Sequence, residues 1–379
     1  MKRVVIAQRR LTHYREPLFD TLRERLRERG VELDLLVGRG TPQEEKKQDV
    51  GYLSWAKTIP THYLAGGRLC WQPLKIHLEE GDLLIVTQEN KLLQNHLLML
   101  KPRRFKLAFW GHGANLQSGN PGGFKERFKR WTTNRVDWWF AYTQISADLV
   151  KAAEFPDERI TVLNNAVDTA EMQRQQQSVT QEETQALRAT LGFGARPVGA
   201  YVGSLYADKR LDFVFDAAEA IRSVVPDFHL LIVGEGPERD KVQAWCAARP
   251  WARWVGARFD REKMAYLSVA QVMLNPGLVG LGILDAFVCG VPMLTTDCDL
   301  HSPEIAYLEN GVNGLMTADD LNAYVGACVR LLREEGALAV LRAGCAAAAL
   351  EYTVENMAQR FSDGIERCLQ TPRCAGGGR

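Results

Sequence analysis

The feature that most constrains the fold of this chain is an alternation of strand and helix patterns that runs along it twice. Short apolar runs such as DLLIVTQ at residues 82–88 and FHLLIVG at residues 228–234 are typical of strands buried on both faces of a parallel sheet. Amphipathic segments, such as EPLFDTLRERLRERG at residues 16–30, lie between most of them. The alternation therefore predicts an α/β fold built from doubly wound parallel sheets.

The alternation restarts with PVGAYVGSL at residues 197–205, after the polar stretch that begins at residue 168. A chain of 379 residues also exceeds the ~250–300 residues at which single cores usually stop growing. We therefore predict a first domain over residues 1–168, an interdomain linker region over 169–196 and a second domain over 197–352. The last residues, 371–379, end in AGGGR and are predicted to form a disordered tail.

Composition excludes several classes of protein. No apolar run reaches the ~20 residues that span a bilayer, and the N-terminus lacks the apolar core of a signal peptide. The eight cysteines are scattered without a C-x-x-C pair, as expected for free thiols in a reducing compartment, and the seven histidines form no metal-ligand pattern. We expect a cytoplasmic protein that binds no metal.

Charge is distributed unevenly along the chain. Residues 1–170 carry 27 Lys and Arg against 20 Asp and Glu, a net charge of +7, whereas the remaining residues carry a net −6. A basic first half indicates that this part of the protein meets something anionic.

The stretch NPGLVGLGILDAFVCGVP, residues 275–292, places Gly277, Gly280 and Gly282 just before an apolar helix pattern that contains one acid, Asp285. Free backbone amides at a helix N-terminus bind anions, and glycines let phosphate oxygens approach the backbone. Asp285 in the first turn could accept hydrogen bonds from ribose hydroxyls. The alternative is a flexible turn in which Asp285 only complements the helix dipole.

A second strand–loop–helix segment, VGSLYADKR at residues 202–210, places Lys209 where the next helix starts. Two α/β domains that face each other form a cleft, and ligands bind at the carboxyl ends of the strands. Lys209 could neutralise a phosphate in this cleft, or it could be an ordinary surface lysine. The segment VGEGPERDK at residues 233–241 lacks the third glycine of a dinucleotide fingerprint and is weak evidence for NAD.

Five stretches in order, GSLYADKRLDFVFDAA, LLIVGEGP, WVGARFDREKMAYLSVAQVMLNP, GLGILDAFVCGVPMLTTD and HSPEIAYLENGVNGL, resemble the C-terminal half of the family 4 retaining, nucleotide-sugar-dependent glycosyltransferases. In the first half, HYREPLFDTL resembles the start of those family members that build bacterial surface polysaccharides. FWGHG and VLNNAVD are similar to further characteristic segments of the family. The resemblance implies the GT-B fold, with two Rossmann-like domains facing across a cleft. The first domain would bind the acceptor and the second the nucleotide sugar, with a C-terminal helix at 353–370 crossing back to the first domain.

The resemblance also implies residue roles in donor binding. The diphosphate would be bound by Gly203, Ser204, Lys209, Gly280, Leu281, Gly282 and Ile283. Asp285 would hold the ribose and Arg258 would lie in the base-contacting loop, while His112, Lys209 and Asp285 would carry catalysis. Two positions depart from the family pattern: Gly277 replaces an acid that contacts the donor sugar, and Ser204 replaces an arginine.

The implied mechanism retains the anomeric configuration, requires neither metal nor another cofactor, and uses the lysine and backbone amides to stabilise the leaving diphosphate. His112 would also approach the donor sugar. Glu89, at a strand end, is a candidate for sugar or acceptor contact, although an acid that caps the following helix has the same pattern. The candidates for the acceptor side follow the first strand and are Arg9, Arg10, His13, Tyr14 and Arg15.

The basic first half offers one candidate for membrane contact. In GFKERFKRW, the side chains of Phe124, Phe128 and Trp131 recur at helical spacing among lysines and arginines. Such a helix could dock on the anionic inner face of the membrane and meet a lipid-linked acceptor, or its aromatics could simply pack in the core. Nucleic acid is a poorer partner. RNA-binding sheets combine basic residues with aromatic residues on their strands, and the sequence has no such pattern.

Three functions remain open at this point. The first is a glycosyltransferase that uses a nucleoside-diphosphate sugar, with UDP as the expected nucleotide, and a glycan or lipid-linked saccharide acceptor. The second is a sugar-nucleotide epimerase or hydrolase. The third is a degenerate GT-B domain that binds a glycan or partner, which the changes at Gly277 and Ser204 would favour.

Overall fold

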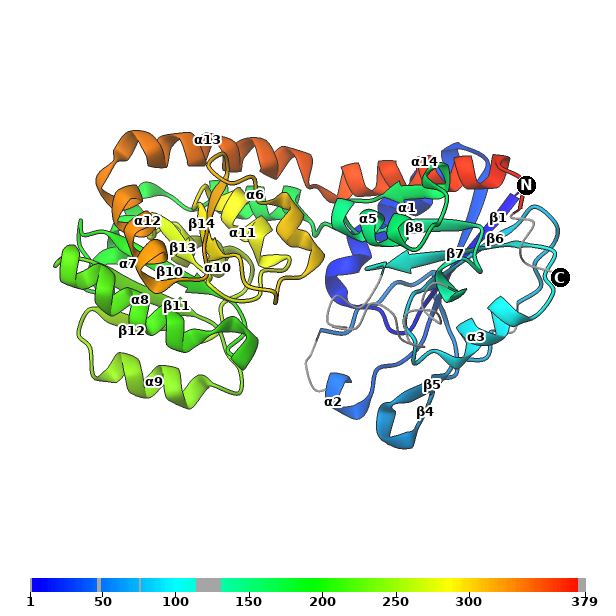
Figure 1. Cartoon of the computed structure of the whole chain (residues 1–379), viewed down its shortest axis with the longest axis horizontal. Helices are drawn as coiled ribbons and strands as arrows, with labels where there is room; N and C mark the ends of the chain where they lie inside the picture. The colour runs from blue at the N-terminus through cyan, green and yellow to red at the C-terminus, as the bar shows by residue number, and fades with distance from the viewer. Residues whose placement is uncertain (1, 46–48, 75, 114–130, 374–379) are drawn as a thin grey trace. The chain divides into compact units, whose positions relative to one another are not determined.

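The computed structural model describes residues 2–45, 49–74, 76–113 and 131–373. The chain divides into two compact units, of which unit 1 comprises Met1–Val167 with Val354–Arg379 and unit 2 comprises Asp168–Thr353. Each unit is an α/β domain with its own parallel sheet, as the alternation predicted (Figure 1).

The sheet of unit 1 has seven strands in the order β3-β2-β1-β6-β7-β8-β9. Their bounds are β1 Lys2–Gln8, β2 Val31–Val37, β3 Lys57–Thr58, β6 Leu83–Thr87, β7 Lys106–Gly111, β8 Trp138–Ala141 and β9 Ile160–Val162. All neighbouring strands pair in parallel. A small antiparallel pair, β4 His62–Leu64 and β5 Leu69–Trp71, was not anticipated from the sequence.

Helices cover both faces of this sheet. The helices of unit 1 are α1 Glu16–Glu28, α2 Pro42–Glu45, α3 Leu93–Leu100, α5 Gln144–Ala152 and α14 Val354–Gln370. Met99 of α3 and Val150 of α5 belong to the core on one face. On the other face Phe19 of α1 and Phe361 of α14 both pack on Trp110 of β7, with ring centroids 5.9 and 5.1 Å apart.

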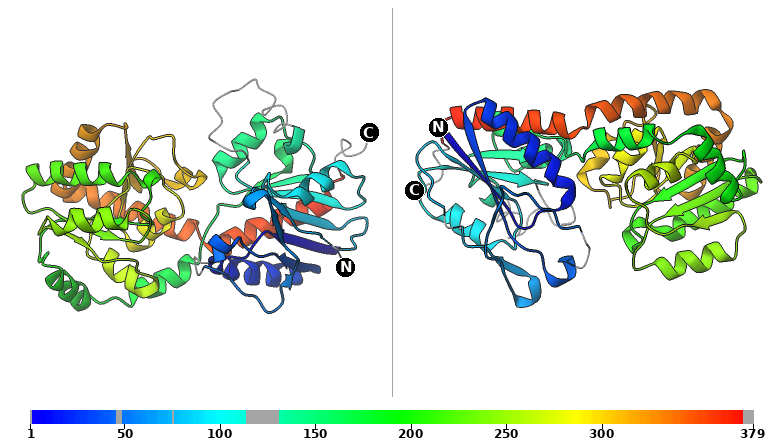
Figure 2. Two further views of the ribbon diagram at one scale, coloured as in Figure 1. Left: turned by 90° about the horizontal axis from the view of Figure 1, so that it is seen from below. Right: turned by 180° about the vertical axis from the view of Figure 1, so that it is seen from behind.

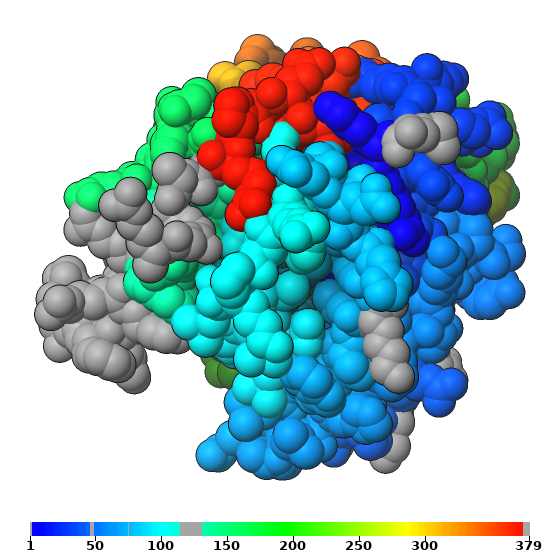
Figure 3. Space-filling view, turned by 90° about the vertical axis from the view of Figure 1, so that its right-hand side faces the viewer, coloured from blue at the N-terminus to red at the C-terminus, as the bar shows by residue number. Residues whose placement is uncertain are grey.

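Helix α14 is held in unit 1 by a buried lysine at its C-terminal end. Lys106 Nζ donates to the carbonyl oxygens of Cys368 (2.7 Å) and Leu369 (2.8 Å), and Lys2 Nζ donates to that of Leu369 (3.2 Å). The space-filling view shows the end of α14 beside the N-terminal strand (Figure 3). Cations at this position satisfy the last carbonyl groups and complement the helix dipole.

Replacing Lys106 with methionine should loosen this attachment. Lys106 is buried, and burial lowers its pKa, so the substitution removes the partner of two carbonyl groups without opening a large cavity. We expect a loss of ~1–3 kcal/mol in the free energy of unfolding, measured by urea denaturation. Lys101→Met, at an exposed lysine of the same unit, is the control; equal midpoints for both variants would contradict this role.

The sheet of unit 2 has six strands in the order β12-β11-β10-β13-β14-β15. Figure 2 gives two further views of the strands and helices of this unit, which are coloured from green to orange. Their bounds are β10 Val198–Val202, β11 His229–Val233, β12 Ala252–Trp254, β13 Val272–Leu274, β14 Met293–Thr296 and β15 Gly314–Thr317. The helices are α6 Thr169–Gln177, α7 Gln181–Thr190, α8 Leu211–Val224, α9 Arg239–Ala247, α10 Asp260–Leu267, α11 Gly282–Cys289, α12 Leu321–Arg333 and α13 Glu335–Glu351. Residues of α8 and α12 form a core with the sheet.

The segment 169–196, expected as an interdomain linker, is a structured part of unit 2. Helix α6 packs on α10 and α11, and α7 packs on α10. Their sequences contain few apolar residues because only one narrow side of each touches the domain; in α6 only Thr169 is fully buried. Capping by Asp168 and Thr180 starts both helices.

In the described part of the chain, no single helix has the length and apolar composition to cross a membrane; one bent pair, α13 with α14, reaches the threshold by length and composition only. The helix expected around Phe124 and Phe128, and most of the expected tail, fall on residues 114–130 and 374–379, which lie outside the described residues.

Candidate active site

A pocket of about 480 Å³ opens in unit 2 where the strand order reverses. Strands β10 and β13 are neighbours, and the chain leaves them toward opposite sides of the sheet. Ligands of open α/β sheets bind at such switch points, beyond the carboxyl ends of the strands. The pocket lining brings together eight residues expected from the sequence, namely Gly203, Ser204, Lys209, Arg258, Gly280, Leu281, Gly282 and Asp285.

Lys209 is one of the cationic side chains that line this pocket, with Arg258 and Lys263. It ends a 3-10 turn, Ala207–Lys209, and its Nζ donates to the Leu278 carbonyl while lying 5.8 Å from the centre of the Tyr206 ring. Burial lowers the pKa of Lys209 to about 8. A half-buried ammonium group with a lowered pKa gains the most from an anion, which restores the charge that burial disfavours.

The glycine loop supplies amide donors beside Lys209. Helix α11 begins at Gly282, and among the described residues no partner accepts from the amides of Gly280, Leu281 or Gly282. Ile283 was expected to contribute a fourth amide, and this was wrong. Its N–H donates to the Gly280 carbonyl at 3.1 Å and its side chain is fully buried, because the first turn of the helix already closes there.

His301 holds this loop, and sequence reasoning missed it. Its Nδ1 accepts from the Val279 N–H (3.2 Å), its Nε2 donates to the Thr296 carbonyl (2.7 Å), and the Ser302 N–H donates to the Val279 carbonyl (2.9 Å). The backbone N–H and carbonyl of Val279 are thereby both hydrogen-bonded. These bonds fix the glycine loop just before its three amide donors. Burial lowers the pKa of His301, which keeps the ring neutral and able to accept from Val279.

The segment GEGP, which was discounted as a cofactor fingerprint, supports the first loop of the pocket. A Cβ at Gly234 would stand 1.8 Å from the Gly203 carbonyl oxygen, and a Cβ at Gly236 would stand 2.4 Å from that of Leu205. Glu235 accepts from the Leu205 N–H through its own carbonyl at 2.9 Å. The glycines therefore allow two backbones to touch.

Gly277, expected near a donor sugar, does not line the pocket. Its Cα packs beneath the turn that carries Lys209, where an added Cβ would stand 2.4 Å from the Asp208 carbonyl oxygen and 2.6 Å from the Lys209 carbonyl carbon. The neighbouring Leu278 N–H donates to the same Asp208 carbonyl at 2.9 Å. No side chain fits at this position unless the backbone of the neighbouring turn shifts.

Asp285, expected to hold a ribose, is paired with a lysine that the sequence did not reveal. Lys263 of α10 lies 2.6 Å from Asp285 Oδ1, and both line the pocket. Arg258 lies over the Tyr266 ring at 5.3 Å and pairs with Glu262 at 3.0 Å, which fixes it at the pocket edge beside the exposed ring of Phe259.

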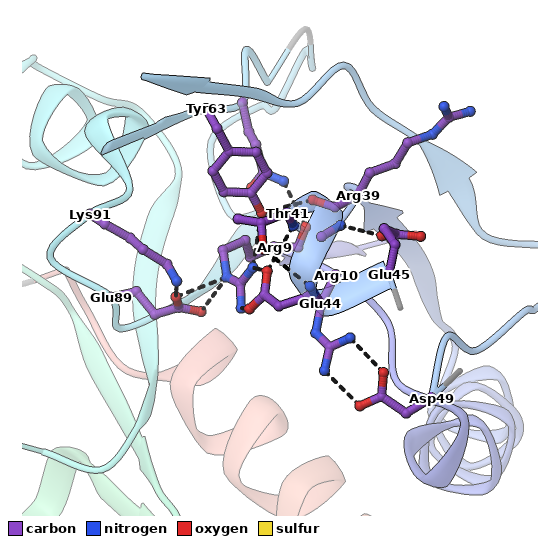
Figure 4. Close-up of polar contacts among 12 residues, drawn as sticks. Arg9, Arg10, Arg39, Thr41, Glu44, Glu45, Asp49, Tyr63, Glu89 and Lys91 are labelled. Carbon is purple, nitrogen blue, oxygen red and sulfur yellow. Dashed lines mark hydrogen bonds and ion pairs between the residues drawn. The ribbon is translucent and has the colours of Figure 1, made fainter. Parts of the chain in front are cut away.

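The candidates in unit 1 follow the central strands β1 and β6, at the corresponding switch point of that sheet. Figure 4 shows that Arg9 is ion-paired on two sides, with Glu44 of α2 at 2.7 Å and Glu89 at 3.0 Å. Arg10 pairs with Asp49 at 2.8 Å. The hydrogen bonds from Arg9 lower the pKa of Glu44 to about 2. Each of the two arginines is therefore paired with a carboxylate, and Glu89 is a partner of Arg9 and of Lys91.

Arg15 is buried and does not offer its charge to an acceptor. Its guanidinium lies over the rings of Trp110 (5.2 Å) and Tyr142 (5.6 Å), with Tyr14 at 5.1 Å. The exposed His112 follows β7, and its ring meets Tyr142 edge-on with centroids 4.5 Å apart. Exposed His13 begins the same 3-10 turn as Tyr14. The structure thus places His112, His13 and Tyr14 at the carboxyl edge of the sheet.

Comparisons with known proteins agree with this architecture. A family model described as Glycosyl transferases group 1 matches residues 196–334, and one described as Glycosyltransferase Family 4 matches residues 17–171. A curated relative, the alpha-D-kanosaminyltransferase of Streptomyces kanamyceticus, is 26% identical over 142 residues, covering 35% of this chain and 34% of that protein. The match therefore spans about a third of the relative's length.

Solved structures resemble the whole chain at low identity. HepE of Anabaena in complex with UDP has a TM-score of 0.67 at 16% identity, covering 97% of this chain and 100% of that one. A glycosyltransferase of Rickettsia africae has a TM-score of 0.68 at 11% identity, covering 98% and 99%. These likenesses establish the GT-B fold.

Proposed function

The chain belongs to the family 4, group 1 glycosyltransferases, and from this membership we propose that it moves a sugar from a nucleoside-diphosphate sugar to a glycan or lipid-linked saccharide. UDP is the proposed nucleotide, and surface polysaccharide or glycolipid synthesis the proposed setting. The observation that carries the proposal is the convergence of Lys209, three free amides and Asp285 on one pocket. The UDP in the HepE complex supports the nucleotide.

We propose a retaining reaction in which the leaving diphosphate is stabilised by unit 2. As the glycosidic bond breaks, negative charge grows on the diphosphate, and preorganised donors aimed at it lower the barrier. Lys209 and the amides of Gly280, Leu281 and Gly282 are such donors. Because they supply positive charge, we propose that no metal or other cofactor is required, and that chelation with EDTA leaves turnover unchanged.

We place the acceptor on unit 1, at the carboxyl edge that carries His112, His13 and Tyr14. His112 is the proposed contact to the donor sugar. Glu89, the second candidate for that contact, is ion-paired with Arg9 and Lys91. Peripheral docking on the inner face of the membrane through the segment that ends at Trp131 remains a prediction, which flotation with anionic vesicles tests.

Calorimetry against UDP, GDP, dTDP, CMP and NAD, followed by the corresponding sugar nucleotides, tests the donor site. We expect saturable binding of one nucleoside diphosphate without metal. Product analysis with and without saccharide acceptors then separates the three functions. A transferase consumes donor efficiently only with acceptor, an epimerase or hydrolase consumes it without, and a degenerate domain does not consume it.

The lowered pKa of Lys209 predicts how donor binding depends on pH. The diphosphate binds the ammonium form, so the contribution of Lys209 to affinity should change little up to about pH 7 and should fall by up to about tenfold per pH unit above about 8, where the free protein loses this proton. Calorimetry with UDP between pH 6.5 and about 9.5 measures this. Lys209→Arg, which stays charged, should have a flat profile; parallel profiles for both proteins would contradict the assignment.

A further inference from the structure

The pair formed by Lys263 and Asp285 connects two helices at the wall of the donor pocket. Lys263 lies on α10, one helical turn after Phe259, and Asp285 lies on α11, three residues after Gly282. The pair therefore stands between the edge formed by Arg258 and Phe259 and the diphosphate-binding amides. In a nucleoside diphosphate, the group between the base and the diphosphate is the ribose.

Each member of the pair keeps unused hydrogen-bonding capacity. The 2.6 Å contact occupies Asp285 Oδ1. Among the described residues, no group donates to Asp285 Oδ2 and no other group accepts from the Lys263 ammonium. The side chains are only 25% and 14% exposed. Burial opposes the charged form of Lys263, yet its pKa is raised beside Asp285, so Lys263 keeps its ammonium form at neutral pH.

A half-buried ion pair is costly unless its remaining donors and acceptors are satisfied. The missing partner must offer a donor to the carboxylate and an acceptor to the ammonium, side by side. A vicinal diol does this, because one hydroxyl donates to Asp285 Oδ2 while the oxygen of the next accepts from Lys263 Nζ. Its adjacent oxygens match the adjacent nitrogen and oxygen of the pair.

We propose that Lys263 and Asp285 together recognise the 2′,3′-diol of the donor ribose, so that Lys263 makes the protein select ribonucleotide donors over 2′-deoxyribonucleotide donors. This inference rests on the proposed function. Asp285 alone would not discriminate strongly, because a carboxylate holds a deoxyribose through its remaining hydroxyl. The ammonium group needs the second oxygen, because with a deoxynucleotide its hydrogens that do not face Asp285 are left without an acceptor in the pocket wall.

The test compares UDP with 2′-deoxy-UDP by calorimetry, with GDP and 2′-deoxy-GDP in parallel, on the full chain. A hydrogen bond to a charged group contributes ~1.5–3 kcal/mol, so the wild-type protein should bind the ribonucleotide about 10–100-fold more tightly. In Lys263→Met this ratio should fall to within about threefold. Lys263→Gln, which keeps an N–H donor without the charge, should have an intermediate ratio.

Lys241→Met is the matched control, because Lys241 lies in the same unit and its ion pair with Asp212 is outside the pocket lining. Its ratio should equal that of the wild type. If Lys263→Met weakens the binding of UDP and of 2′-deoxy-UDP equally, Lys263 contacts the diphosphate or only connects α10 to α11. The inference is then wrong. Equal wild-type binding of UDP and 2′-deoxy-UDP overturns it while leaving the donor site intact. Binding of no nucleoside diphosphate at all instead removes the proposed function.

Discussion

Lys209→Ala should lower kcat/KM for the donor by about 100-fold or more. Removal of one preorganised donor from a developing oxyanion typically costs 10²–10³ in rate, and Lys209 is the one full positive charge among the described groups proposed to contact the diphosphate. The loss should appear in kcat as well as in KM, because charge on the leaving diphosphate grows in the transition state. Steady-state kinetics of donor consumption with a saturating acceptor measures both.

The substitution also removes a hydrogen bond to the Leu278 carbonyl, so thermal unfolding must be measured alongside. Lys241→Ala is the control for loss of a lysine from the same unit. A variant that is well folded and keeps its affinity for UDP and its turnover would show that the diphosphate lies elsewhere. Lys209→Arg should recover part of the activity, since the charge is restored in a different shape.

Gly277→Ala should impair both stability and donor binding, although Gly277 does not line the pocket. The new Cβ would stand 2.4 Å from the Asp208 carbonyl oxygen and 2.7 Å from that of Lys209, and both are backbone atoms that cannot rotate away. Overpacking of this kind costs ~1–3 kcal/mol. Relief of the clash must move the turn that carries Lys209, so we expect the affinity for UDP to fall at least about tenfold.

Gly326→Ala is the matched control, because a Cβ at this position in α12 meets nothing within 4 Å. It should leave UDP affinity unchanged and should stabilise the helix slightly. Calorimetry and thermal unfolding of both variants decide the matter. If Gly277→Ala keeps the wild-type affinity for UDP and the wild-type unfolding midpoint, the turn that carries Lys209 can shift to accept a side chain. The backbone clash would then not have the expected effect.

The sequence was sufficient to predict the two parallel sheets and the main loops of the candidate pocket, but not the antiparallel pair β4 and β5. Buried parallel strands are short apolar runs with glycine or polar residues at their ends, and the loops that follow β10 and β13 converge wherever such a sheet forms. Lys209 and the glycine loop were candidates from their position after strands, and the resemblance to the glycosyltransferase family then favoured them over the alternatives. Asp285 was placed in the first turn of its helix, and the structure agrees.

What the sequence did not reveal depends on contacts between distant segments. Lys263 lies on α10, whose sequence is mostly polar, so the sequence does not distinguish it from a surface lysine. Only the packing of α10 against α11 brings Lys263 to Asp285. Arg9 and Arg10 were candidates for the acceptor side, and the sequence did not reveal their partners, because Glu44 lies in the four-residue helix α2 and Asp49 in the segment that follows it. The aromatic cage around Arg15 is likewise assembled from three separate strands or turns.

The discontinuous make-up of unit 1 has a consequence for the order in which the protein can be completed during synthesis. Unit 2 is contiguous, so the ribosome releases everything that it needs once Thr353 has emerged. Unit 1 begins to emerge first but lacks α14, whose Phe361 covers Trp110 and whose last turn is capped by Lys2 and Lys106. The nascent N-terminal sheet must therefore wait with one apolar face covered by α1 but not yet by α14, and exposed apolar surface of this kind favours aggregation during synthesis.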